Sequence, residues 1–248
     1  MSKQSYRVFQ AILLLALFLF LGSKLVNNQL SWYINPRFIT LTQIGILSLA
    51  VLVYRLIAEI RRSHEHHEHD DHDHDHTPSS VNLLIMLIPL LVGVLIPARP
   101  LGSATVSTKG PITSAPLISS QAQSQERLVP TEERSILDWY YLFAFEEDIE
   151  QFMGEEASVI GFVYFDERLP KGQFFVSRII LSCCAADGYA VTMIVDWPEA
   201  AALKQDTWIR VTGPLGKAYF ADDPQAIPLI RAKTVEIVPQ PDAPYLFP

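Results

Sequence analysis

Cysteine is nearly absent from this chain, and histidine is absent from most of it. The two cysteines, Cys183 and Cys184, are adjacent, so they cannot cross-link distant segments. No disulfide framework therefore holds the fold, and packing must stabilise it. Because every histidine lies within residues 64–76, no imidazole is near the thiols in sequence to activate one as a nucleophile.

Basic residues are scarce in the second half of the chain. From Gly102 onward, 20 acidic residues face 11 basic ones. An acidic region without a basic stripe repels phosphate backbones, which argues against a nucleic-acid partner. The same region has no nucleophile–base set and no carboxylate pair at a recognisable spacing, so we expect no enzymatic activity.

Long apolar runs dominate the first hundred residues. They cover about residues 9–25, 38–54 and 81–97, and each approaches the length that crosses about 30 Å of hydrocarbon. The first run has a basic start, as a cleaved signal peptide would, but no clear small-x-small cleavage site follows it. We therefore interpret it as a retained helix. The sequence predicts three transmembrane helices in a domain of residues 1–100.

Lys and Arg beside these runs indicate an orientation. One side would hold Lys3, Arg7, Arg55, Arg61 and Arg62, and the other Lys24, Arg37, Arg99 and Lys109. The positive-inside rule then places the N-terminus and the loop between the second and third runs in the cytoplasm. We expect a multi-pass protein of the plasma (inner) membrane with an extracytoplasmic C-terminal domain.

The chain after residue 100 changes character twice. Residues 101–129 are rich in Ser, Thr, Ala and Pro without a helical period, which predicts a linker. Residues 130–248 then form a soluble domain, with a helix up to about residue 153 and β-like runs at 157–165, 172–182, 189–197, 207–213 and 227–238. Five short strands predict a small barrel of the OB type. The tail from Pro239 is expected to be frayed or loosely packed.

The fold class is therefore an α-helical membrane domain followed by a mostly-β, OB-like barrel with one preceding helix. Aromatic residues of that helix, from Trp139 to Phe143, recur at helical spacing beside the predicted sheet. Such a stripe is more typical of a core than of a binding surface.

All seven histidines fall in one acidic loop, residues 63–77. They are His64, His66, His67, His69, His72, His74 and His76. Neutral imidazole is a ligand for zinc, nickel, copper and cobalt, and the interleaved carboxylates neutralise charge. We predict binding of a divalent metal, with zinc favoured by ligand type although the affinity series alone favours copper. Transport, sensing and buffering all stay open, as does a merely solvated acidic loop.

A second group of candidate ligands lies in the soluble domain. Cys183, Cys184 and Asp187 come at the end of a predicted strand and enter a turn. Two thiolates and a carboxylate would form part of a metal site if another ligand came from elsewhere. The alternative is that the cysteines are ordinary small residues, at least one of them pointing into the barrel.

Several stretches together resemble the YcgQ-like family of bacterial membrane proteins. They include the Pro100–Ser103 exit from the third run, the Asp138–Tyr140 stretch, the Ser182–Asp187 segment with its two cysteines, and the terminal VPQPDAPYLF. Members of this family are described as candidate subunits of a two-component permease. The resemblance implies a larger multi-spanning permease as partner, a link to zinc supply, and functional roles for Cys183, Cys184 and Asp187.

Two functions remain as hypotheses. The first is an accessory subunit of a membrane permease complex that handles a divalent metal, because three spans without intramembrane acid or histidine make a poor ion pathway alone. The second is a membrane-anchored assembly or scaffold protein whose β-domain binds a protein partner, with the histidine loop as a non-specific metal buffer.

Overall fold

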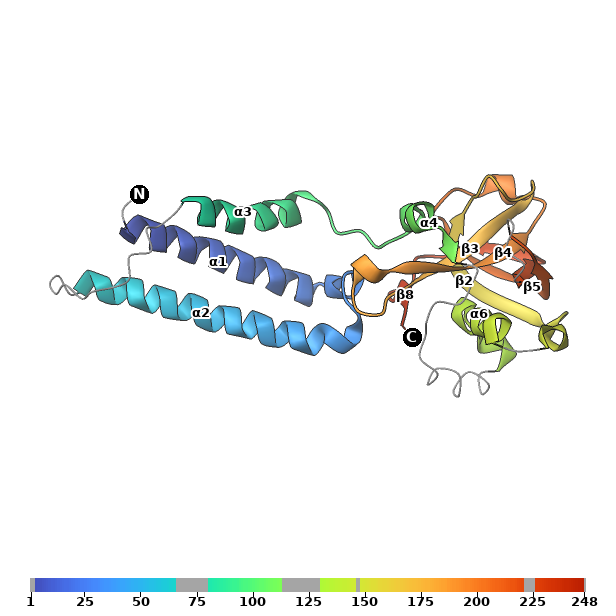
Figure 1. Cartoon of the computed structure of the whole chain (residues 1–248), viewed down its shortest axis with the longest axis horizontal. Coiled ribbons are helices and arrows are strands. Elements are labelled where there is room, and N and C mark those ends of the chain that lie inside the picture. Colours follow the sequence, from blue (N-terminus) through green and yellow to red (C-terminus); the bar gives the residue numbers. More distant parts are fainter. Residues whose placement is uncertain (1–2, 66–79, 113–129, 146–147, 221–225, 248) are drawn as a thin grey trace. The chain divides into compact units, whose positions relative to one another are not determined.

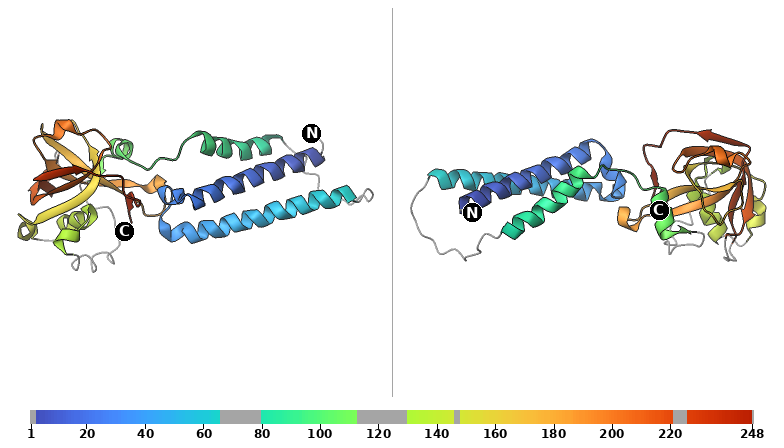
Figure 2. Two further views of the ribbon diagram at one scale, coloured as in Figure 1. Left: turned by 180° about the vertical axis from the view of Figure 1, so that it is seen from behind. Right: turned by 90° about the horizontal axis from the view of Figure 1, so that it is seen from above.

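The chain folds into two compact units, residues 1–99 and 100–248. The computed structural model describes residues 3–65, 80–112, 130–145, 148–220 and 226–247 (Figure 1). The first unit is helical and the second is built around a β-sheet (Figure 2).

Unit 1 consists of three helices. They are α1 (Lys3–Val26), α2 (Ile39–Glu65) and α3 (Ser80–Leu95). Both α2 and α3 contact α1 (Figures 1 and 2). The connection between α1 and α2 contains two 3₁₀ turns, η1 (Gln29–Trp32) and η2 (Pro36–Phe38). The Asn35 side chain accepts a hydrogen bond from the Arg37 N–H, and Pro36 occupies the first position of η2. Both features start a helix cleanly at this point.

Two helices of the described chain are long and apolar enough to cross a membrane. They are Ser5–Val26, of 22 residues, and Pro36–Arg62, of 27 residues. At about 1.5 Å per residue these reach roughly 33 Å and 40 Å, against about 30 Å of hydrocarbon. The apolar part of α3, Leu83–Leu95, would reach only about 20 Å and is too short to cross the hydrocarbon by itself. Of the three predicted spanning helices, the first two therefore have the length and composition of a span, and the third is not confirmed.

The helices of unit 1 contact one another through a small residue and an ion pair. A Cβ built on Gly93 of α3 would lie 2.7 Å from the Cζ atom of Phe20 in α1, so the ring sits directly against the glycine. Arg7 of α1 and Glu59 of α2 form an ion pair of 3.0 Å. This pair joins the beginning of α1 to the C-terminal part of α2, so the two helices run antiparallel.

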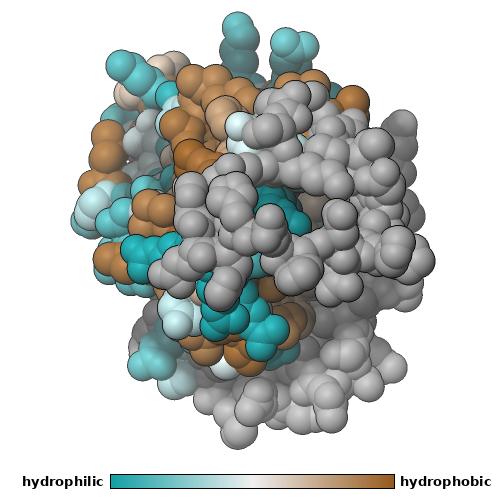
Figure 3. Space-filling view, turned by 90° about the vertical axis from the view of Figure 1, so that its left-hand side faces the viewer, coloured by the Kyte–Doolittle hydropathy of each residue, from teal (hydrophilic) through white to brown (hydrophobic). Residues whose placement is uncertain are grey.

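Large apolar side chains on these helices are exposed. Leu19, Leu47, Tyr54 and Leu84 are each more than half exposed, and only 11% of each candidate span is buried inside the structure. The core helix of a soluble protein would be mostly buried. In Figure 3 brown apolar residues and teal hydrophilic residues both appear on the part of the face that is not grey.

Unit 2 contains a closed five-stranded barrel. Its strands are β2 (Glu156–Tyr164), β3 (Gln173–Ile180), β4 (Tyr189–Asp196), β5 (Trp208–Ala218) and β6 (Ile227–Arg231). β2, β3 and β4 form an antiparallel meander, β4 pairs with β6 in parallel, and β6 returns through antiparallel β5 to β2. The predicted small barrel is confirmed. The last predicted strand is divided into β6 and β7 (Thr234–Ile237), which pairs with β5.

The barrel core follows the predicted pattern, but the preceding α-helix ends at Phe145 rather than near residue 153, and a separate 3₁₀ turn follows it. Alternate residues of the strands fill the interior, among them Val159, Val176, Met193 and Val211. Helix α6 (Ile136–Phe145) lies between two 3₁₀ turns, η3 (Thr131–Glu133) and η4 (Ile149–Phe152), and packs against β2, β4 and β6. Trp139 of α6 is fully buried, which confirms that the aromatic stripe belongs to the core.

The segment expected to be a linker begins with ordered structure. Helix α4 (Ser103–Lys109) and strand β1 (Pro111–Ile112) fall within it, and β1 pairs in parallel with β4. Asp206 accepts hydrogen bonds from the backbone N–H and the hydroxyl of Ser103, and Val106 is fully buried. We call residues 101–112 the strap, because they are fastened along unit 2. Residues 113–129 lie outside the described part of the chain.

The C-terminal tail also differs from expectation. Strand β8 (Tyr245–Leu246) pairs in parallel with β3, and Tyr245 is buried. The Tyr245 hydroxyl accepts a hydrogen bond of 2.7 Å from the backbone N–H of Leu101. The prediction of a frayed tail was wrong here, because one buried aromatic side chain fixes the tail to the strap.

Candidate metal centre

Cys183, Cys184 and Asp187 come together in one tight turn between β3 and β4. Residues Ala185–Asp187 form a single 3₁₀ turn, η5, with Cys184 as its N-cap. The Asp187 backbone N–H donates to the Cys184 sulfur, and the Asp187 carboxylate accepts from the Cys184 N–H. This reciprocal arrangement is a capping box, with cysteine in the place usually taken by Ser or Thr.

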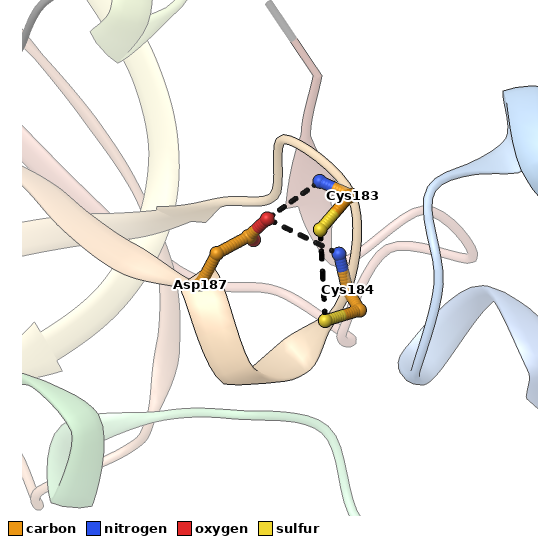
Figure 4. A group of neighbouring side chains, drawn as sticks. All are labelled: Cys183, Cys184 and Asp187. Atoms are coloured by element: carbon orange, nitrogen blue, oxygen red, sulfur yellow. Dashed lines mark hydrogen bonds between the residues drawn. The ribbon is translucent and has the colours of Figure 1, made fainter.

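The Asp187 carboxylate organises the backbone that carries both thiols. Its Oδ2 atom accepts hydrogen bonds from the N–H groups of Cys183, at 2.6 Å, and Cys184, at 3.3 Å. Its Oδ1 atom accepts from the Ser182 N–H at 3.2 Å. Figure 4 shows the carboxylate pointing at the two cysteine nitrogens while the two sulfur atoms lie next to each other.

The two sulfur atoms are 3.7 Å apart. A tetrahedral zinc ion with Zn–S bonds of about 2.3 Å holds two sulfur ligands about 3.8 Å apart. The thiol pair therefore already has the spacing that two ligands of such an ion require. Ligand atoms of Cys183, Cys184 and Asp187 all lie within 4.8 Å of one another.

Charge around the turn favours the protonated form of the first thiol. The Asp187 carboxylate, and after it the Cys184 thiol, raise the pKa of Cys183 to about 11, because Cys183 donates hydrogen bonds to both as a neutral thiol. Burial raises the pKa of Asp187, but the hydrogen bonds from Cys183, Cys184 and Ser182 outweigh it and lower that pKa overall. A metal ion must therefore displace a proton from Cys183 to bind it.

Neither cysteine behaves as a core residue. Cys183 is exposed and Cys184 is partly exposed. Free cysteine is among the most buried residue types, so an adjacent pair of which neither member is buried needs another explanation. The alternative in which at least one thiol points into the barrel is wrong.

The strap holds the other side of the same turn. The Lys109 ammonium, at the end of α4, donates to the carbonyl oxygens of Ala186 at 2.8 Å and Gly188 at 2.6 Å. A Cβ on Gly188 would lie 2.7 Å from the Leu101 Cδ1 atom and 2.9 Å from the Leu181 Cδ2 atom, so a larger residue here would force these side chains to shift. Sequence analysis placed Lys109 among the charges flanking the membrane and gave it no role at the site. Its separation of nearly eighty residues from the turn leaves no local signal for the contact.

Two domain families cover nearly the whole chain. The DUF1980 N-terminal domain matches residues 9–112, and the DUF1980 C-terminal domain matches residues 118–248. The chain belongs to the DUF1980 family. The N-terminal match ends at residue 112, where the strap ends, so the family's division assigns the strap to the N-terminal domain, whereas by contacts it packs with unit 2.

Curated relatives of this DUF1980 chain include two bacterial proteins. It is 29% identical to the UPF0703 protein YcgQ of Bacillus subtilis (strain 168) over 97 residues, which are 39% of this chain and 34% of that protein. It is 24% identical, over 202 residues, to a Streptococcus mutans (serotype c, strain ATCC 700610 / UA159) protein whose name describes a candidate subunit of a two-component membrane permease complex. That match covers 66% of this chain and 72% of the relative. The resemblance to the YcgQ-like family is confirmed.

Among solved structures, a small single-stranded DNA-binding protein from Streptomyces coelicolor aligns with part of the DUF1980 chain. The identity is 12% and the TM-score is 0.23, with 34% of this chain and 93% of that protein covered. A likeness at this level carries no argument about function.

The histidine loop is largely beyond the described residues of this DUF1980 protein. His64 belongs to the last turn of α2, and His66, His67, His69, His72, His74 and His76 lie outside the described part of the chain. The loop therefore stays a prediction from sequence. Within the described residues, the structure brings together the candidate ligands Cys183, Cys184 and Asp187.

Proposed function

We propose that this chain is an accessory subunit of a membrane permease complex, and that its soluble unit receives a divalent metal ion, zinc in the first place, at Cys183 and Cys184. The observation that carries the metal part is the pair of sulfur atoms 3.7 Å apart, on the exposed Cys183 and the partly exposed Cys184, in a turn built around Asp187. The name of the streptococcal relative supports the permease part.

The residues present fit zinc as two ligands of four. Cys183 and Cys184 would bind through sulfur, whereas each oxygen of Asp187 already accepts at least one backbone hydrogen bond. Asp187 serves first to position the thiols and second as a possible oxygen ligand. With two positions left for water or for groups of another molecule, the site resembles an open site rather than a closed structural one.

The histidine loop is proposed to concentrate the ion at the opposite membrane face. Imidazoles and carboxylates in residues 63–77 offer many weak ligand sets, which suits capture and release better than permanent binding. We place this loop and the N-terminus in the cytoplasm and unit 2 outside, following the charges beside the helices.

A separate multi-spanning permease is the proposed partner. The candidate spans Ser5–Val26 and Pro36–Arg62 carry charged residues only toward their ends, among them Arg7, Lys24, Arg37 and Glu59. Residues that conduct ions through a membrane are usually polar and face a bundle interior. Because neither span carries an acidic residue or a histidine at its centre, the conducting pathway is assigned to the partner.

Cellular zinc content tests this function. Strains that carry wild-type protein, a deletion of residues 63–77, or a Cys183→Ser, Cys184→Ser double substitution are compared in zinc-supplemented and zinc-limited medium. We expect the zinc content of both variant strains to shift toward that of a strain lacking the protein, while the amount of the protein in the membrane stays unchanged. If zinc content stays at the wild-type level while disruption of the barrel still abolishes complex assembly, the protein is a scaffold and not a metal-handling subunit.

A further inference from the structure

The turn at Cys183 and Cys184 offers a bound ion two sulfur ligands and few other protein ligands. Both oxygens of Asp187 accept backbone hydrogen bonds, from Ser182 at Oδ1 and from Cys183 and Cys184 at Oδ2. Residues 100–248 contain no histidine and no third cysteine. A four-coordinate ion must therefore find ligands elsewhere, whereas a centre that needs only two protein sulfurs would be complete.

We infer that Cys183 and Cys184 together also bind a trivalent metalloid of the arsenous type, R–As(OH)₂, as a two-sulfur adduct. Such a centre forms three bonds in a pyramidal arrangement, so two come from the thiols and the third is the substituent R that the ligand brings. It is strongly thiophilic, and the thiol pair is the soft ligand set that it prefers. This inference uses the site assigned above but does not depend on zinc as its ligand.

The reaction balances without an oxidant, a reductant or a metal. Two As–O bonds break and two As–S bonds form, and each thiol proton leaves with one hydroxyl group as water. The products are the cyclic dithiol adduct and two molecules of water, and arsenic stays trivalent throughout. The protein must supply only two thiols on one side of the same turn.

The turn provides that arrangement before the ligand arrives. The sulfur atoms are 3.7 Å apart, and a pyramidal centre with an S–As–S angle near a right angle requires them to move only slightly closer. The exposed Cys183 leaves room for the substituent R on the solvent side. Hydrogen bonds to Asp187 on one side and from Lys109 on the other hold the backbone, so little conformational freedom is lost on binding.

Phenylarsine oxide is a suitable probe, because in water it presents two hydroxyl groups and one phenyl substituent. The full-length, detergent-solubilised and reduced protein is titrated with it, and the adduct is measured by intact-mass spectrometry. We expect one adduct per chain, with the mass of the hydrated probe less two waters. Cys183→Ser and Cys184→Ser should each weaken binding by at least about 100-fold, because the second bond becomes intermolecular.

A variant that keeps both thiols separates a built site from a generic dithiol. Asp187→Asn should weaken binding about 10-fold, since it loosens the turn, whereas Asp196→Asn, an exposed acid at the end of β4, should leave it unchanged. Circular dichroism checks that each variant is folded. If Asp187→Asn unfolds the protein, Lys109→Gln is a second variant that loosens the same turn. Equal binding by wild type and both loosened variants, or retention of the adduct in the single serine variants, would overturn the inference.

Parallel zinc titration keeps this inference distinct from the proposed function. If the protein binds the arsenical at both thiols but has no cysteine-dependent zinc site, the proposed zinc function is refuted and the metalloid inference stands. If it binds zinc at these thiols but forms no two-sulfur adduct, only the metalloid inference is refuted.

Discussion

Asp187 mainly holds the turn together through its carboxylate, so its substitution should lower the stability of the protein. Its carboxylate accepts three backbone N–H groups around the two cysteines. Asp187→Ala removes these acceptors, and loss of a side-chain cap typically costs about 1 kcal/mol of stability. We expect the free energy of unfolding to fall by about 1–2 kcal/mol in denaturant titration followed by tryptophan fluorescence. Asp196→Ala, on an exposed position, should stay within about 0.5 kcal/mol of wild type, and an equal loss in both would refute the capping role.

The raised pKa of Cys183 gives zinc binding a definite pH dependence. With its pKa raised to about 11 by Asp187 and Cys184, Cys183 is protonated throughout the physiological range. Zinc must displace that proton, so its affinity should rise by up to about tenfold for each pH unit between pH 6.5 and 8.5, for this one proton. Calorimetry in buffers of different ionisation enthalpy measures both the slope and the proton release. A flat profile would mean that Cys183 is not a ligand.

Among single residues, the sequence indicated the three candidate ligands but not the contacts that support them. Two adjacent cysteines followed by an acid are visible in the sequence, and the structure brings ligand atoms of all three within 4.8 Å of one another, while metal binding stays a prediction. The contribution of Lys109 depends on contacts to Ala186 and Gly188 that are distant in sequence. Such contacts become visible only once the strap is placed on the sheet.

Among the elements, the α1–α3 contact provides a sharp test of unit 1. Gly93→Val would place a side chain where the Phe20 ring lies, since even a Cβ would be 2.7 Å from Phe20 Cζ. Overpacking of this kind typically costs about 1–3 kcal/mol. Gly45→Val in α2 is the matched control, because no atom lies within 4 Å of its built Cβ. We expect a lower aggregation temperature in detergent for Gly93→Val alone, and equal temperatures would show that α3 does not pack on α1.

The elements that sequence analysis placed well are those with a strong local period. The five strands of the barrel and helix α6 combine alternating or helical apolar patterns with turn residues at their ends. The strap and β8 were missed because their order comes from partners elsewhere: Asp206 for Ser103, β4 for Pro111–Ile112, and β3 for Tyr245–Leu246. A two-residue strand has no period to detect. Helix α3 ends at Leu95, two residues before Pro97, because the residue that precedes a proline disfavours the helical conformation.

For the whole molecule, the two native cysteines report the side of the membrane on which unit 2 lies. Both are in unit 2, and Cys183 is exposed. We predict that a membrane-impermeant maleimide labels the protein in intact cells, because unit 2 is proposed to be extracytoplasmic. The Cys183→Ser, Cys184→Ser variant controls for background, and permeabilised cells give the maximum signal. Labelling that appears only after permeabilisation would place unit 2 in the cytoplasm and reverse the proposed topology.

The central claim is that unit 2 holds a specific metal site at Cys183 and Cys184, apart from the histidine loop. Its most direct test is calorimetric zinc titration of the reduced full-length protein, the deletion of residues 63–77, and the Cys183→Ser, Cys184→Ser variant. We expect one tight site that survives deletion of the loop and disappears in the serine variant, together with several weak sites that are lost with the loop. If only weak, loop-dependent sites appear, the turn between β3 and β4 is not a metal centre and the account is contradicted.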